Sequence, residues 1–110
     1  MAYTVVTIPR FDREMKQLAK KYSSLKEEYK LLVKELEKNP EKGIPLGNNL
    51  YKIRLAIVSK GKGKSGGARV ITYLKTEEEN IYLLSIYEKG KRDTISDKEI
   101  TAILNSDVIF

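Results

Sequence analysis

Basic residues gather in one stretch of this 110-residue chain, at positions 51–75, which holds seven Lys and Arg and no Asp or Glu. The whole chain has a net charge of +6, so this stretch accounts for the excess. Arginine forms paired hydrogen bonds with phosphate oxygens, and lysine adds a compact positive charge. Such a concentration favours a phosphate-rich partner, most of all RNA. A solvated lysine-rich loop is the alternative interpretation.

Side chains that are missing restrict the chemistry, because the chain has no His and no Cys. Without His there is no ordinary general base for neutral pH and no Ser-His arrangement. Without Cys, disulfides and zinc–thiolate sites are excluded, which favours a cytoplasmic protein. Acidic residues 77–79 fit a solvated turn better than a metal site, so we expect no metal and no cofactor. No apolar run approaches the roughly 20 residues of a membrane span, so we expect no membrane partner.

Lys, Arg and Tyr remain, and they suffice to cleave RNA without a metal. RNA carries its own nucleophile, the 2′-OH beside the scissile phosphate. An enzyme must align this oxygen, accept its proton, stabilise the charged phosphorane and protonate the leaving 5′ oxygen. Arginines suit the phosphate, a lysine crowded by other cations can act as a base, and a tyrosine can pass a proton or stack on a base.

The basic stretch is predicted to be a β-hairpin, because two alternating apolar runs flank a segment of Gly, Ser and Lys. In the first run, Lys52 and Arg54 share one face and Ile53 lies on the other. In the second run, Arg69 follows two glycines, where a backbone can approach a ligand closely. Lys52 and Arg54 either contact the ligand or form the wet face of a half-buried strand.

The rest of the chain is expected to frame this hairpin in a single α+β domain over residues 1–110. The other expected elements are a strand at 3–8, helices at 9–22 and 24–39, a loop at 41–49, an acidic turn at 75–80, an apolar strand at 81–88 and a helix from 96. The order is β-α-α-β-β-β-α, with a helical hairpin and a short C-terminal helix on a small, mainly antiparallel sheet. Capping boxes at Ser24 with Glu27, and at Ser96 with Glu99, are predicted to begin two helices.

Three segments resemble the RelE/ParE superfamily of bacterial toxins, and the HigB-type, RelE-like group most closely: YKIRL at 51–55, GKSGGARVI at 63–71 and LLSIYEK at 83–89. The predicted element order also matches that family's fold, so the resemblance covers nearly the whole chain. It implies an mRNA interferase, an endoribonuclease that cuts message in the ribosomal A site by metal-independent attack of the 2′-OH and so inhibits translation. It also implies a cognate antitoxin that blocks this activity.

The motif match implies roles for individual residues. Lys52 and Arg54 stand where the family keeps cationic residues on the first hairpin strand, and Arg69 stands where it keeps a phosphate-binding arginine. Lys89, or Arg92 nearby, falls where the family keeps a basic residue after the last strand. We predict that the catalytic residues are Arg69, Lys64, Arg54, Tyr87 and Lys89, and that the RNA-phosphate contacts are Lys52, Lys60, Lys62, Ser65 and Arg92.

Some alternatives stay open at this point. RelE itself uses a tyrosine where residues 93–96 of this chain have none, so Tyr87 is the nearest candidate for proton transfer, and a core position is its alternative role. For Lys64 and Ser65 the alternative is a loop that only solubilises the hairpin. For the whole chain, the alternatives are a ParE-like inhibitor of DNA gyrase and a non-catalytic RNA-binding module.

Overall fold

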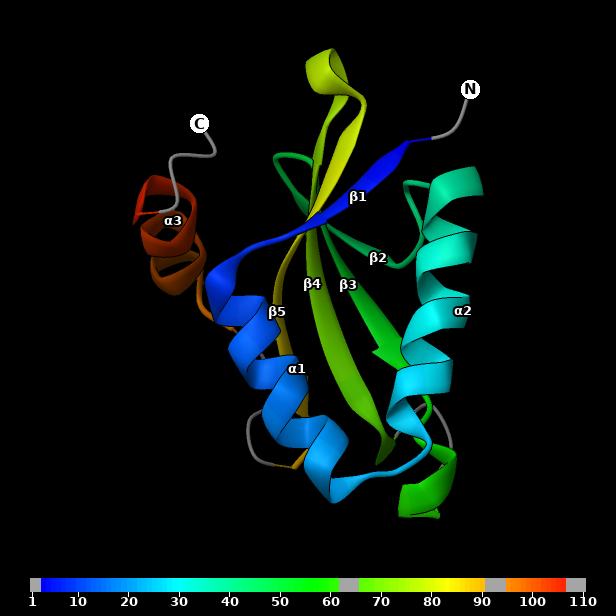
Figure 1. Cartoon of the computed structure of the whole chain (residues 1–110). Helices are drawn as coiled ribbons and strands as arrows, with labels where there is room; N and C mark the ends of the chain where they lie inside the picture. Colours follow the sequence, from blue (N-terminus) through cyan, green and yellow to red (C-terminus); the bar gives the residue numbers. More distant parts are fainter. Residues whose placement is uncertain (1–2, 62–65, 91–94, 107–110) are drawn as a thin grey trace.

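The computed structural model describes residues 3–61, 66–90 and 95–106 (Figure 1). Its elements, in chain order, are β1 (Thr4–Thr7), α1 (Pro9–Lys21), α2 (Leu25–Lys38), β2 (Ile44–Gly47), β3 (Leu50–Leu55), the 3-10 turn η1 (Val58–Lys60), β4 (Ala68–Lys75), the 3-10 turn η3 (Thr76–Glu78), β5 (Asn80–Glu88) and α3 (Asp97–Ser106). No helix within these ranges has both the length and the apolar character to cross a membrane.

The five strands form one sheet in the order β1-β5-β4-β3-β2. β1 runs parallel to β5, and every other neighbouring pair is antiparallel. The α+β class, the mainly antiparallel sheet and the order of the predicted elements are confirmed. β4 is the central strand, with β5 on one side and β3 on the other. Both strands of the basic hairpin therefore have a neighbouring strand on each side.

The predicted loop at 41–49 is wrong in part, because it contains the additional edge strand β2, which pairs with the start of β3. Asn48 and Asn49 both have positive φ, at 53° and 63°. Two consecutive residues of this kind make the tight turn that joins antiparallel strands, and Asn tolerates the left-handed conformation better than most residues. The Asn-Asn pair therefore marks a hairpin, although it is less typical than Asn-Gly.

α1 and α2 pack their apolar sides against one face of the sheet (Figure 1). α1 begins at Pro9, as expected for a residue that has no N–H to leave unpaired. Each large apolar side chain that a helix buries against the sheet stabilises the folded state by roughly 1.5–3 kcal/mol. The buried residues on the helices are Phe11, Leu25, Leu32 and Leu36, and those on the strands below include Ile53, Val70 and Ile86.

The predicted capping box at Ser24 is wrong, because Ser24 has helical backbone angles and makes no side-chain cap. Its hydroxyl donates to Glu28 Oε1 at 3.1 Å and accepts the Ser59 N–H at 2.9 Å. Glu28 Oε2 accepts the Val58 N–H at 2.6 Å. The Ser24 hydroxyl, which a local cap would use, is thus engaged by η1, and these hydrogen bonds hold η1 against the start of α2.

The second capping box is half formed. Ser96 Oγ accepts the Glu99 N–H at 3.1 Å, which satisfies one free donor at the start of α3. The Glu99 carboxylate does not reach back to Ser96. It accepts a hydrogen bond from Arg10 Nη2 at 2.8 Å, which holds α3 against the start of α1.

Candidate functional site

Three of the predicted site residues form a row across neighbouring strands. Arg54 of β3 is the register partner of Arg69 of β4, and Arg69 is in turn the partner of Tyr87 of β5. Directly opposite residues of an antiparallel pair point to the same face, with Cβ atoms about 4.5–5.5 Å apart. Arg54, Arg69 and Tyr87 are therefore neighbours on one face, and we call them the cross-strand row.

The cross-strand row lies on the face that α1 and α2 leave uncovered. Successive residues of a strand point to opposite faces. Glu88, next to Tyr87, turns toward α1, where it accepts a hydrogen bond from the Tyr22 hydroxyl at 2.5 Å. Tyr87 and its partners must then face the other way. Lys52, two residues before Arg54, belongs to the same side of β3 and extends the positive charge along it.

The three side chains of this row differ in their exposure. Arg54 is exposed, but Arg69 has only 5% of its surface exposed, and its Nη1 donates to the Ala68 carbonyl at 3.0 Å. Tyr87 is also buried, with 8% exposed. Guanidinium groups on neighbouring strands can donate hydrogen bonds to the oxygens of one phosphate.

Lys60 does not join the row, although it was predicted to contact RNA. Its ammonium lies 2.9 Å from Glu88 Oε2 on the helix-covered face, and the Lys21 ammonium lies 3.2 Å from Glu88 Oε1. The hydrogen bond from Tyr22, followed by those from Lys60 and Lys21, lowers the pKa of Glu88 from 4.5 to about 2. We call Lys21, Tyr22, Lys60 and Glu88 the Glu88 cluster.

Of the other predicted residues, Lys89 is half-buried beside the start of β4. Its N–H donates to the Gly67 carbonyl at 2.9 Å, and its own carbonyl accepts from the Lys60 ammonium at 3.4 Å. Lys89 thus lies at the end of β5, two residues beyond Tyr87. Predictions for Lys62, Lys64, Ser65 and Arg92 fall outside the described residues.

The glycine before Ala68 serves the sheet itself, which corrects the interpretation that it admits a ligand. A Cβ on Gly67 would lie 2.1 Å from the Leu55 carbonyl oxygen and 3.0 Å from the Ile57 nitrogen. No side chain fits at such distances, so β4 can begin beside β3 only with glycine at this position. Gly67 therefore helps to set the register that places Arg69 opposite Arg54.

The sequence reasoning missed the Glu88 cluster. Its members are far apart in the chain, and the pairing of Lys60 with Glu88 depends on how β3, β5 and α1 come together. A signal was nevertheless present, since Glu88 is the one acidic residue in the apolar run 81–88. A carboxylate that ends an apolar strand needs cationic or hydrogen-bonding partners, and the neighbouring basic stretch was the obvious source.

Comparisons with known proteins agree with this architecture. The family model described as the RelE toxin of the RelE/RelB toxin–antitoxin system matches residues 10–107. A free-state double arginine-to-alanine mutant of Escherichia coli RelE is 19% identical, with a TM-score of 0.61 over 99% of this chain and 97% of that one. The intact E. coli RelBE toxin–antitoxin complex gives 23% identity and a TM-score of 0.61, covering 83% of this chain and 100% of that one. The RelBE2 toxin–antitoxin complex of Mycobacterium tuberculosis gives 16% sequence identity and a TM-score of 0.59, covering 81% of this chain and 100% of that one.

Proposed function

The chain belongs to the RelE family of toxins from toxin–antitoxin systems, and we propose that it is a ribosome-dependent endoribonuclease that cuts mRNA in the A site and stops translation. The observation that carries this proposal is the cross-strand row, in which two arginines lie side by side on the face of the sheet that α1 and α2 do not cover. Two guanidinium groups on neighbouring strands can donate together to the oxygens of one phosphate. The proposal places the protein in the cytoplasm, where ribosomes work.

In this mechanism the RNA supplies the nucleophile and the protein supplies charge and alignment. The 2′ oxygen attacks the adjacent phosphorus, the new O–P bond forms, and the bond to the 5′ oxygen breaks, leaving a 2′,3′-cyclic phosphate and a 5′-hydroxyl. Arg69 and Arg54 would donate to the non-bridging oxygens, which gain negative charge in the phosphorane. Removing one such donor from an active site commonly costs about 10²–10³ in rate.

The proton transfers need a group that can lose or gain a proton, and the cross-strand row contains one, the Tyr87 phenol. We assign Tyr87 to pass a proton at one of the two oxygens, with Lys64 or Lys89 as the second group. Lys52, Lys62, Ser65 and Arg92 would hold the flanking phosphates. Lys60 would contribute less to RNA binding, because its ammonium group already forms an ion pair with Glu88.

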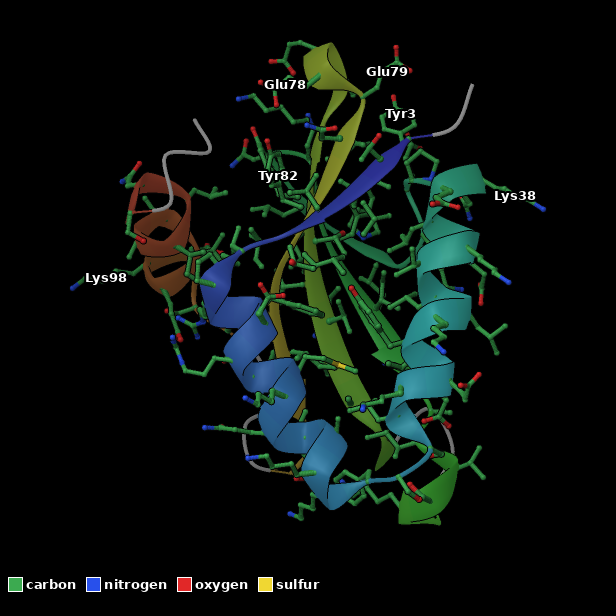
Figure 2. All side chains as sticks on the ribbon, in the orientation of Figure 1. Tyr3, Lys38, Glu78, Glu79, Tyr82 and Lys98 are labelled. Carbon is green, nitrogen blue, oxygen red and sulfur yellow. The ribbon has the colours of Figure 1, made fainter. Side chains whose placement is uncertain are left out.

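Induced expression without antitoxin tests the proposal, with primer extension on mRNA as the measurement. The wild-type protein should arrest growth and leave cleaved message, and Arg69→Ala should abolish both while the protein still folds. Lys98→Ala is the control, because Lys98 is an exposed residue of α3 that points away from the sheet (Figure 2). Full toxicity of Arg69→Ala would show that the site is wrongly assigned.

The same experiment separates the other candidate functions. A gyrase inhibitor would damage DNA and leave message intact. A non-catalytic RNA-binding module would bind RNA with an affinity that falls steeply as salt increases, without cleavage in the presence or absence of ribosomes. Membership of the HigB-type group stays a prediction.

A further inference from the structure

α1 and α2 line a hollow on the side of the domain away from the cross-strand row. The two helices lie side by side and are joined by residues 22–24 (Figure 1). The hollow has a volume of about 310 Å³, which lies at the lower end of the range for ligand pockets, roughly 300–1,000 Å³. We call it the helix hollow, and its apolar lining residues are Phe11, Met15, Ala19 and Tyr29.

The aromatic part of the helix hollow suits a planar ring. The Phe11 side chain is 1% exposed, and the half-buried Tyr29 ring lies 5.9 Å from it between centroids. Ala19 is small and leaves room beside them. Unpaired RNA bases are bound in proteins by stacking on aromatic side chains of this kind, which every base can do with its flat face.

Two polar groups of the helix hollow can read the edge of such a ring. Burial, followed by the charge of Asp12, raises the pKa of Tyr29, so its hydroxyl stays protonated and can donate a hydrogen bond. The Asp12 carboxylate also lines the hollow, and within the described ranges it forms no ion pair. A carboxylate accepts hydrogen bonds from the amino group of a base. Cytosine has an amino group beside a ring acceptor, whereas uracil has no amino group.

The rim of the helix hollow is basic. Lys16 and Lys26 line it, and Lys20 lies one turn beyond Lys16 on α1. All three side chains are exposed, and none forms an ion pair with any residue that the structure describes. Even with Asp12 among them, these residues leave a net positive charge around an apolar hollow. This charge complements the phosphates on either side of a bound base.

We propose that the helix hollow binds one unpaired base of a single-stranded RNA segment, with lysines of its rim on the flanking phosphates. The base would stack on Tyr29 and donate from its amino group to Asp12. The cross-strand row lies on the other face of the sheet, so this strand is not the one that is cut. The inference rests on the proposed function in one respect, because a ribosome-bound toxin would meet this strand in ribosomal RNA.

Ala19→Met tests the helix hollow itself, because the longer side chain fills space without changing charge. Binding of a cytidine octamer, measured by fluorescence anisotropy, should weaken about fivefold or more, since one stacked base is lost. The same fold-loss is expected in the Arg69→Ala background, because the two sites lie on opposite faces. Ala102→Met is the matched control, at an exposed position of α3, and should bind as wild type does. Unchanged binding by Ala19→Met would contradict the proposal.

Lys26→Gln tests the phosphate contacts and removes no packing. It should lower the slope of log affinity against log salt by about 1. Lys38→Gln is its control, since it makes the same change on α2, does not line the helix hollow and points away from the domain (Figure 2). An unchanged slope for Lys26→Gln would exclude this phosphate contact.

The choice of base tests the role of Asp12. Wild-type protein should bind a uridine octamer about fivefold or more weakly than the cytidine octamer, because uracil offers no amino group to the carboxylate. Asp12→Ala should remove this preference. Equal binding of the two octamers by wild type would overturn the assignment of an amino-bearing base.

Amide chemical shifts of Ala19 and Lys26 locate the bound RNA directly. Both should move when the wild-type toxin is titrated with the cytidine octamer. Absent shifts would overturn the proposal, as would shifts that follow toxin concentration alone, which would mean a second toxin copy, or shifts that need added antitoxin. Since none of these measurements needs cleavage, a wild-type toxin that binds the octamer here but cuts no mRNA would contradict the nuclease proposal and leave this one standing.

Discussion

Two groups of cations lie on opposite faces of the sheet, and they differ in their surroundings. In the Glu88 cluster, Lys60 and Lys21 share one carboxylate, so part of their positive charge is balanced inside the fold. In the cross-strand row, Arg54 and Arg69 lie side by side on neighbouring strands. The comparison shows that the basic residues of one stretch fall on both faces of the sheet, where Lys60 forms an ion pair within the fold and Arg54 is exposed.

The largest expected effect comes from changing the cross-strand row. Arg69→Lys keeps the charge but removes the planar pair of donors that suits a phosphate. We expect cleavage in a ribosome-based assay to fall by about 10²-fold, because a preorganised donor to the phosphorane is lost. Arg13→Lys, on the exposed surface of α1, is the control and should keep full activity. An active Arg69→Lys would mean that charge alone suffices at this position.

Changing the Glu88 cluster should affect stability more than activity. Glu88→Gln keeps an acceptor for the Tyr22 hydroxyl but loses the ion pairs with Lys60 and Lys21. We expect the free energy of unfolding, measured by urea denaturation, to fall by about 1–3 kcal/mol. Glu27→Gln, which removes an exposed ion pair with Lys30, should cost about 0.5 kcal/mol or less. A loss of cleavage without a loss of stability would contradict this division of roles.

The pH dependence of stability offers a separate test of the same cluster. The pKa of Glu88 is lowered from 4.5 to about 2 in the folded state, chiefly by the Tyr22 hydrogen bond. Its stabilisation is therefore complete above about pH 4.5 and is lost as pH falls toward 2. Because water screens part of the interaction, we expect about 1–2 kcal/mol across this window. The difference between wild type and Glu88→Gln should shrink over the same range, and a constant difference would exclude Glu88 as its source.

The smallest expected effects distinguish Lys52 from Lys60, which the sequence predicts to have the same role in binding RNA phosphates. Lys52→Gln should weaken RNA binding a few-fold and lower the slope of log affinity against log salt by about 1, because one phosphate contact is lost. Lys60→Gln should leave this slope unchanged, since the Lys60 charge is already balanced by Glu88. Filter binding of a short RNA over a range of salt concentrations measures both. Equal changes in slope would show that Lys60 contacts RNA after all.

Much of the fold was predictable from local patterns. The alternation in β3 correctly separates Lys52 and Arg54 from Ile53, and Pro9 marks the start of α1. β2 was missed because its signal is the Asn48-Asn49 turn, whose positive φ values a sequence only suggests. Ser24 was misassigned because its partner Ser59 is 35 residues away, and local capping rules ignore such competition.

The candidate site was predictable in its residue types but not in its geometry. Arginine, lysine and tyrosine near a glycine-rich segment indicated phosphate chemistry. Which of them meet depends on the register of β3 with β4 and of β4 with β5, and a slip of one residue would turn Arg69 away from Arg54. That register depends on Gly67 and on pairing between separate strands, so no single segment encodes it.

The most direct measurement of the central claim is a double-mutant cycle of Arg54→Ala and Arg69→Ala on the rate of mRNA cleavage by the ribosome-bound toxin. If both guanidinium groups hold one phosphate, the effects should be coupled by about tenfold or more, so that the double variant loses much less than the product of the single losses. Single losses that multiply to within about twofold would show that the two arginines act independently, and the shared phosphate site would not exist.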